Sequence, residues 1–192
     1  MATITAFESV TLDGVMQAPG RPDEDTRGGF SDGGWALPYQ DEVAGQFAAE
    51  RMSSGGAMLF GRRTYEDLLG FWTTTPEPNP FTDALVNTPK YVVSRNRDLR
   101  LAYPNSTLLP GDASETVGEL RRTVDGTITV LGSGELVRAL LDAGLVDELV
   151  LLRHPLVLGN GATLFASSRF ELELLRTVPT TTGVVIAHYA VR

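Results

Sequence analysis

Apolar residues along this chain fall into two kinds of segment, short continuous runs and longer stretches with helical spacing. The short runs are rich in β-branched residues and bounded by glycine or polar residues, which is typical of buried strands. The longer stretches repeat apolar residues three or four positions apart, as Val43 and Phe47 do, and predict amphipathic helices. The predicted strands are 3–10, 57–60, 90–94, 127–131, 147–153, 170–178 and 184–191, with 108–109 as a candidate edge strand; the predicted helices are 41–52, 64–69, 114–124 and 135–143, with one or two helical turns at 81–87.

Predicted strands and helices alternate over the first three quarters of the chain, and the last two strands follow each other across a turn at 179–183. Strand–helix–strand units form parallel sheets, whereas a short turn joins antiparallel strands. We therefore predict an α/β fold with a mostly parallel central sheet, flanking helices and an antiparallel C-terminal strand pair. The 192 residues show no repeat and no break in composition, so residues 1–192 are expected to form a single domain.

The composition limits the chemistry and the partners that are expected. The net charge of -8 opposes non-specific binding to nucleic acid or to an anionic membrane. The chain has no cysteine, which excludes disulfides, thiolate zinc sites and a cysteine nucleophile, and its two isolated histidines predict no metal site. The N-terminus has no basic start, and no apolar run approaches the roughly 20 residues of a membrane span. We expect a soluble, cytoplasmic protein.

Two predicted strands, 57–60 and 90–94, end in turns that contain arginine. Guanidinium groups bind phosphate through paired hydrogen bonds, and a threonine at a helix start can donate to a phosphate near the positive helix end. The alternatives are a capped helix with solvated arginines for the first turn and a solvated arginine for the second, but two such turns on one sheet favour an anionic ligand. The residues are Gly61, Arg62, Arg63 and Thr64 in the first turn and Ser94 and Arg95 in the second.

A third turn, at 132–135, connects the strand 127–131 to a predicted helix. Glycines at such a turn let the backbone approach a pyrophosphate, and the helix dipole favours its charge. The usual dinucleotide-binding fingerprint needs Gly or Ala at position 137, which is valine here. Taken alone, the turn is also compatible with an ordinary tight connection. Its residues are Gly132, Ser133, Gly134 and Glu135.

The three turns occur in a fixed order with several other motifs. These are Ser-Val-Thr-Leu-Asp-Gly at 9–14, Gly-Gly-Trp-Ala-Leu-Pro at 33–38, Leu-Phe-Gly-Arg-Arg-Thr-Tyr-Glu at 59–66, Lys-Tyr-Val-Val-Ser-Arg at 90–95, Gly-Ser-Gly at 132–134, Gly-Leu-Val-Asp-Glu-Leu at 144–149 and Pro-Leu-Val-Leu-Gly-Asn-Gly-Ala-Thr-Leu-Phe at 155–165. As an ordered set they resemble the dihydrofolate reductase-like superfamily. The closer resemblance, over nearly the whole chain, is to the reductase of bacterial riboflavin biosynthesis and its stand-alone relatives.

The resemblance implies NADPH as cofactor, hydride transfer to a heterocycle, and a homodimer. By position, Arg62 and Thr64 match residues that hold the 2′-phosphate and the pyrophosphate, and Ser94 and Arg95 match the adenosine-phosphate side. The turn 132–134 matches the segment that approaches the nicotinamide and the pyrophosphate. Arginines near the ribose 2′ position favour NADPH over NADH. The predicted cofactor site is completed by Gly61, Arg63 and Glu135.

Two positions depart from the dihydrofolate reductase pattern. Those enzymes join two adjacent glycines by a cis peptide at the third turn, but position 133 is serine here, and a cis non-proline bond costs about 3 kcal/mol. They also carry a carboxylate two residues after the proline of the Trp-x-Leu-Pro motif, where this chain has Gln40. The next residue, Asp41, is rotated by about 100° on a helix. Folate reduction is therefore not the favoured reaction.

Four residues near the same sheet edge are candidate substrate-binding groups. Asp13 follows the first strand and Asp41 starts the first helix, and both are candidate catalytic proton donors. A turn aspartate and a helix-start carboxylate are the structural alternatives. Trp35 could cover an aromatic ring or seal the core, and Gly159 lies in a turn that could face a substrate or a dimer mate.

The function predicted from these residues is that of an NADPH-dependent reductase acting on a small pteridine- or pyrimidine-like heterocycle. Hydride would pass from the nicotinamide to the substrate, with a proton from Asp41, Asp13 or water. The alternative is a non-catalytic nucleotide-binding or dimeric interaction protein on the same fold. A phosphotransferase is disfavoured because the chain has no Gly-x-x-x-x-Gly-Lys motif.

Overall fold

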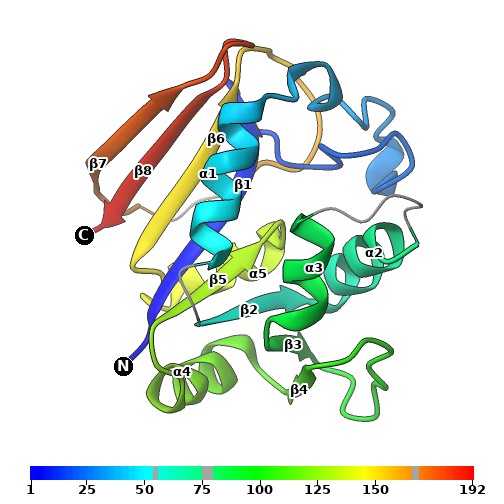
Figure 1. Cartoon of the computed structure of the whole chain (residues 1–192), viewed down its shortest axis with the longest axis vertical. Helices are drawn as coiled ribbons and strands as arrows, with labels where there is room; N and C mark the ends of the chain where they lie inside the picture. Colours follow the sequence, from blue (N-terminus) through cyan, green and yellow to red (C-terminus); the bar gives the residue numbers. More distant parts are fainter. Residues whose placement is uncertain (54–55, 75–79, 166–168) are drawn as a thin grey trace.

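In the part of the chain that the structure describes, eight strands pair side by side in one twisted sheet (Figure 1). The computed structural model describes residues 1–53, 56–74, 80–165 and 169–192. The strands are β1 Thr3–Thr11, β2 Gly56–Gly61, β3 Lys90–Ser94, β4 Ser106–Pro110, β5 Thr127–Leu131, β6 Glu148–His154, β7 Leu172–Pro179 and β8 Val185–Val191. The helices are α1 Glu42–Ser53, α2 Arg62–Trp72, α3 Pro80–Asn87, α4 Ala113–Thr123 and α5 Gly134–Asp142.

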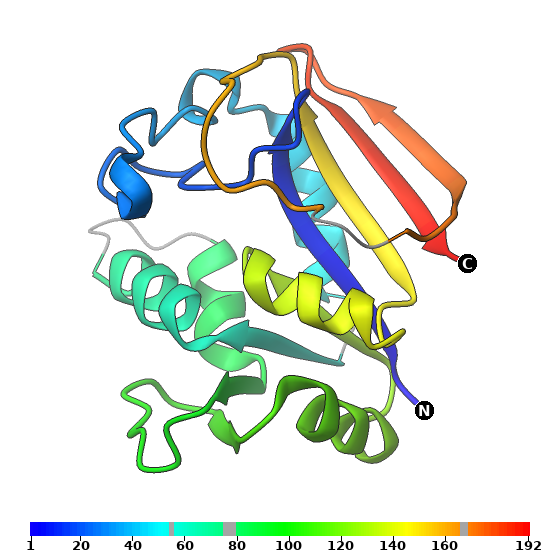
Figure 2. The ribbon, with the colours of Figure 1, turned by 180° about the vertical axis from the view of Figure 1, so that it is seen from behind.

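The order of the strands across the sheet is β4-β3-β2-β5-β1-β6-β8-β7. Pairing is parallel from β4 to β6, and β8 and β7 extend that edge in antiparallel orientation. Figure 1 shows α1 and α3 in front of the sheet, and Figure 2, from behind, shows α4 and α5 over the opposite face. The predicted mostly parallel α/β sheet with an antiparallel C-terminal strand pair is confirmed, and the candidate edge strand at 108–109 is part of β4.

The two faces of β1 bury different side chains, because successive residues of a strand point to opposite faces. Ile4, Ala6 and Val10 lie in a core cluster with apolar residues of α4 and α5, whereas Phe7 packs with the clusters on the other face. Burial on both faces explains why the central strands are continuous apolar runs. Glu8 shares the α5 face and is 3% exposed.

The long segment between β1 and α1 is a packed loop with two short 3-10 turns, Arg27–Gly29 and Leu37–Tyr39. Arg21 forms a salt bridge with Asp67 on α2, and Arg27 forms one with Glu135 on α5. These pairs fix the loop against the middle of α2 and the start of α5. The loop also has its own buried apolar cluster, formed by Val15, Ala18, Phe30 and Trp35.

Helix α2 is longer than predicted at both ends. It begins at Arg62 because Gly61 takes extended backbone angles (φ -75°, ψ 152°) as the N-cap, so the two arginines lie inside the first helical turn. It continues past the predicted end at residue 69 to Trp72. Residues 75–79 lie outside the described residues, and Pro80 begins α3. Within the described ranges, no helix has the length and apolar character to cross a membrane.

Candidate functional site

Two helix N-termini meet at the carboxyl end of the sheet. Helix α2 follows β2, helix α5 follows β5, and these two strands are neighbours. The backbone N–H of Gly61 donates to Ser133 Oγ (3.0 Å), and Thr64 Oγ1 donates to the carbonyl of Gly132 (3.1 Å). The structure therefore brings the first and third predicted turns into direct contact. Because both helices present their positive ends here, the junction suits negatively charged phosphate groups.

Three arginines surround this α2–α5 junction. Arg62 and Arg63 lie in the first turn of α2 with 45% and 59% of their side chains exposed, and Arg27 comes from the loop before α1. Arg62 pairs with Glu66 (3.2 Å), whereas Arg63 (3.3 Å) and Arg27 (2.7 Å) both reach Glu135. Exposed pairs of this kind contribute about 0–1 kcal/mol, so a phosphate could replace a carboxylate partner at little cost.

Ser94 and Arg95 follow β3, one strand further along the same edge. Val93 is the register partner of Gly61, which places the second predicted turn beside the junction. Ser94 is buried, and its hydroxyl accepts a hydrogen bond from the N–H of Asn96 (3.1 Å). Arg95 is exposed. Ser94 therefore shapes the turn, and Arg95 is its exposed cation.

The turn 132–134 depends on the absence of side chains at both glycines. Gly132 has a left-handed conformation (φ +55°), and a Cβ on Gly134 would lie 1.7 Å from Sδ of Met16, which packs directly on the turn. The Gly132–Ser133 peptide bond is trans. The hydroxyl of Ser133 also donates to the carbonyl of Leu131 (3.2 Å), so this side chain ties the ends of β2 and β5 together.

A cavity of about 150 Å³, here called the inner cavity, opens beside this turn on the side of α1 and α3. Its wall is mostly apolar, and it includes the same Gly132 whose carbonyl accepts from Thr64. The candidate phosphate junction and the inner cavity therefore share Gly132. The lining residues are Phe7, Ala48, Arg51, Leu68, Phe81, Thr129, Leu131 and Gly132.

Arg51 gives the inner cavity one charged group. Its Nη2 lies 3.2 Å from Oε2 of Glu148, which is also 2.9 Å from Nε2 of His188 and accepts from Thr5 Oγ1 (3.2 Å). Burial alone would raise the pKa of Glu148, but the hydrogen bonds from His188 and Arg51 outweigh it and lower the pKa. The cluster therefore holds Arg51 beside an ionised carboxylate.

The two predicted catalytic carboxylates lie outside the inner cavity. Asp13 accepts from the hydroxyl of Thr11 and from the N–H of Gly159 (2.7 Å), which ties the end of β1 to the loop after β6. Asp41 accepts from the N–H of Val43 (2.7 Å) at the start of α1 and from the N–H of Thr181 (2.8 Å). Both hydrogen-bond sets lower the carboxyl pKa, the side-chain donors Thr11 and Thr181 having the largest effect. Their catalytic role stays a prediction.

The other two predicted substrate residues also have structural partners. Trp35 is buried, its indole N–H donates to the carbonyl of Gln17 (2.7 Å), and its ring meets that of His154 edge-on at 5.0 Å. Gly159 has φ +75° and donates its N–H to Asp13. Neither residue lines the inner cavity. Residues of its wall such as Phe7 and Thr129 were missed, because an inward strand residue looks the same in sequence whether it meets a core or a cavity.

The buried carboxyl of Glu8 was also missed. It is 3% exposed, and its Oε1 has no hydrogen-bond partner. Burial raises the pKa of Glu8 from 4.5 to about 8; the backbone N–H of Ser133 opposes this rise, and the charge of Glu24 adds to it. Glu8 is therefore mostly protonated at pH 7. The signal in the sequence is an acidic residue inside the apolar run 3–10.

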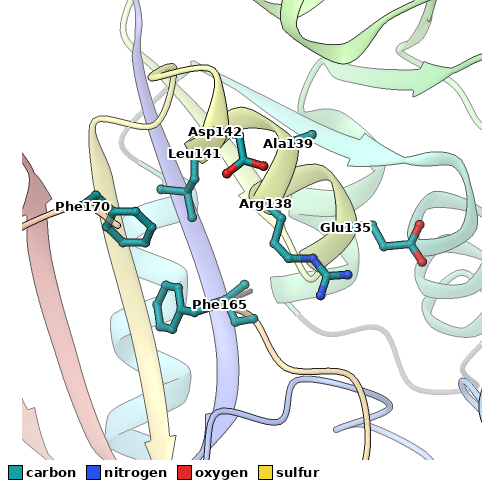
Figure 3. A pocket seen from close by; sticks show the side chains of 8 residues that line it. Glu135, Arg138, Ala139, Leu141, Asp142, Phe165 and Phe170 are labelled. Atoms are coloured by element: carbon teal, nitrogen blue, oxygen red, sulfur yellow. The ribbon is translucent and has the colours of Figure 1, made fainter. Parts of the chain in front are cut away.

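A second cavity, of about 300 Å³, lies on the outer side of α5 (Figure 3). Phe165 and Phe170, with ring centroids 5.6 Å apart, face Arg138 and Leu141 of the helix. Arg138 donates to the carbonyl of Thr163 (2.8 Å), which holds the following loop against α5. Among the residues that line it, Glu135 is shared with the α2–α5 junction.

One family model matches almost the entire chain. Residues 2–186 match the model described as the RibD C-terminal domain. An uncharacterised protein of Bacillus subtilis, YyaP, is 33% identical over 138 residues, which cover 67% of this chain and 70% of that protein.

Solved structures share the fold at lower identity. A pyrimidine reductase-like protein from Corynebacterium diphtheriae superposes with a TM-score of 0.70 at 13% identity, covering 100% of this chain and 92% of that one. A dihydrofolate reductase from Enterococcus faecalis, complexed with NADP(H), gives 0.61 at 17% identity, covering 98% and 94%. At these identities the likeness establishes the fold, and the predicted dihydrofolate reductase-like architecture is confirmed.

Proposed function

The chain belongs to the RibD C-terminal domain family, and from this membership and the site we propose that it is an NADPH-dependent reductase of a small pteridine- or pyrimidine-like heterocycle. The observation that carries the proposal is the double role of Gly132. This residue contacts Thr64 in the junction of two helix N-termini and also forms part of the wall of the inner cavity. A cofactor with its phosphates at the junction would reach a ring in the cavity at this point.

The residues at the junction fit a phosphorylated dinucleotide. The N–H groups at the starts of α2 and α5 would bind its phosphates, and Arg62, Arg63 and Arg95 lie along the same edge as cations for the 2′-phosphate. The buried Oε1 of Glu8 beside the same turn has no protein partner that a polar group of the cofactor would have to displace. When bound, NADPH supplies the hydride.

The inner cavity would hold the heterocycle. Its apolar wall excludes water and orients a flat ring, which is the main contribution a protein makes to hydride transfer. Arg51 and Thr129 are the hydrogen-bonding side chains in that wall. Hydride transfer also needs a proton. Neither Asp13 nor Asp41 lines the cavity, so solvent is as compatible with the geometry as a source of this proton as either carboxylate is.

The proposal is tested by cofactor binding to the Arg62→Ala variant. Loss of a charge-assisted hydrogen bond to the 2′-phosphate, about 1.5–3 kcal/mol, should weaken NADPH binding by roughly 10- to 100-fold while NADH, which lacks that phosphate, changes little. Arg122→Ala, an exposed arginine in the last turn of α4, is the matched control. Calorimetry measures both affinities. No saturable binding of NADPH to the unaltered protein, or equal losses for both cofactors, would contradict the assignment.

A non-catalytic nucleotide-binding or interaction protein remains the second candidate. The observation that favours it is the lack of an acidic side chain among the described residues that line the inner cavity. NADPH oxidation with a panel of pteridines and pyrimidines separates the two, because binding without turnover of any compound supports the second. The homodimer stays a prediction.

A further inference from the structure

The carboxyl of Glu8 lies at the point where β1 and β5 separate. Pairing between these strands ends at Phe7 and Leu131, whereas β1 continues to pair with β6 as far as Thr11. Glu8 is therefore the first residue of β1 beyond its pairing with β5. Its side chain points to the α5 face, as alternation along β1 requires, and Ser133 at the start of α5 interacts with it through its N–H.

The unpartnered Oε1 of Glu8 needs an explanation. A buried polar atom without a hydrogen bond costs free energy, and nearly all such atoms in proteins have a partner. Every other buried side-chain nitrogen or oxygen within the described ranges has one. This atom lies at a fork between strands and next to a candidate cofactor turn, so a bound ligand is one partner that would satisfy it.

We propose that Glu8 binds the carboxamide of the nicotinamide ring through a pair of hydrogen bonds made by its neutral carboxyl. A protonated carboxyl presents one O–H donor and one carbonyl acceptor, and a primary carboxamide presents a matching carbonyl and N–H. The two groups are complementary, and an ionised carboxylate would lose one of the two bonds. This inference rests on the proposed function.

The place of the ring follows from the two ends of the site. Phosphates at the α2–α5 junction and a heterocycle in the inner cavity are linked through Gly132, so the redox ring must lie beside Gly132. Ser133, the next residue, interacts with Glu8. Phe7 lines the inner cavity, and Glu8 points to the opposite face of β1. This places Glu8 to contact the carboxamide substituent of the nicotinamide ring and not the heterocyclic substrate.

The surroundings of Glu8 favour its neutral form. Its register partner on β6 is Leu151, and the α5 residues in the same core cluster are apolar. From the loop before α1, Glu24 contributes a negative charge, and Glu135 at the start of α5 is already paired with two arginines. Because ionisation of Glu8 removes the O–H donor, cofactor affinity should fall as the pH rises above the Glu8 pKa of about 8.

The test compares NADPH with adenosine 2′,5′-bisphosphate, which lacks the nicotinamide, by calorimetry at pH 7 and pH 9. For the unaltered protein, NADPH affinity should fall about tenfold from pH 7 to pH 9. The reason is that the fraction of protein molecules whose Glu8 carboxyl is neutral falls by about that factor. Glu8→Gln keeps a donor and an acceptor that do not titrate, and should bind NADPH equally at both pH values. Glu8→Leu should lose at least about tenfold at pH 7.

The bisphosphate is the internal control for folding and for phosphate titration, and its affinity should be the same in all three proteins. Two results would overturn the role of Glu8 and leave the proposed function standing. The first is that Glu8→Gln loses NADPH affinity with rising pH as the unaltered protein does. The second is that Glu8→Leu binds NADPH as tightly as the unaltered protein. If the unaltered protein binds neither the bisphosphate nor NADPH at pH 7 or at pH 9, the proposed function itself fails.

Discussion

Replacement of Glu8 by glutamine should change how the stability of the ligand-free protein depends on pH. Glu8 keeps its proton in the folded protein up to a pKa of about 8, whereas the unfolded chain releases it near 4.5. Between these values the folded state binds more protons than the unfolded state, so the free energy of unfolding falls as the pH rises. The Glu8→Gln variant has no proton to release here, and this part of the pH dependence should disappear.

The magnitude follows from the pKa difference. At 1.36 kcal/mol for each pH unit, a change from 4.5 to about 8 corresponds to about 5 kcal/mol of stability, present below pH 4.5 and lost by pH 8. Even half of this amount would be a large share of the free energy of unfolding of a typical folded domain, which is roughly 5–15 kcal/mol.

Urea unfolding from pH 5 to pH 9, followed by the fluorescence of Trp35 and Trp72, measures the difference. From pH 5 to pH 9, the free energy of unfolding of Glu8→Gln should rise by several kcal/mol relative to that of the unaltered protein. Glu119→Gln, an exposed carboxyl on α4, controls for the loss of one charge and should leave the curve unchanged. Parallel curves for Glu8→Gln and the unaltered protein would refute the burial of a neutral carboxyl.

Two further predictions concern buried bases. Lys90 Nζ donates to three carbonyls at and just after the end of α3, and all three would lose this partner in Lys90→Met. The variant should therefore lower the free energy of unfolding by about 1–3 kcal/mol. Urea unfolding measures this change, and an unchanged midpoint would contradict it. Burial lowers the pKa of His154, whose ring packs against Trp35 and Tyr39, so stability should fall as the pH drops below 6.5. His154→Phe should flatten this acid limb, and an identical limb would argue against the assignment.

The alternation of strand and helix in the sequence predicts most of the fold because each buried parallel strand is an uninterrupted apolar run. The ends of elements are harder to predict, as α2 illustrates. Its helix begins directly after Gly61 and includes two arginines that read as turn residues, since their long side chains are solvated in either setting. The strand β4 shows the same limit: only its Leu108–Leu109 core stands out from a polar segment, while its other residues pair through the backbone.

The candidate site is predictable where it depends on backbone and less so where it depends on packing. The turns at 61–64 and 132–135 carry glycines and a hydroxyl that a tight helix start requires, and the structure joins them. The wall of the inner cavity comes from strand and helix residues such as Phe7 and Arg51, whose neighbours are set by the tertiary fold. The sequence therefore indicates the side of the site proposed to bind phosphates and does not indicate the side proposed to hold the heterocycle.

Three carboxyls at this end of the sheet show why an acidic residue cannot be assigned a role from its position in the sequence. Asp13 and Asp41 accept hydrogen bonds from hydroxyl and backbone N–H donors, and those donors lower the pKa of both. Each is thereby fixed as an anion that holds two segments together. Glu8 lies in a strand whose N–H groups point along the sheet and not toward its side chain, so burial dominates and its pKa rises. The direction of nearby backbone donors, which only the folded chain determines, separates the two carboxyls whose pKa is lowered from the one whose pKa is raised.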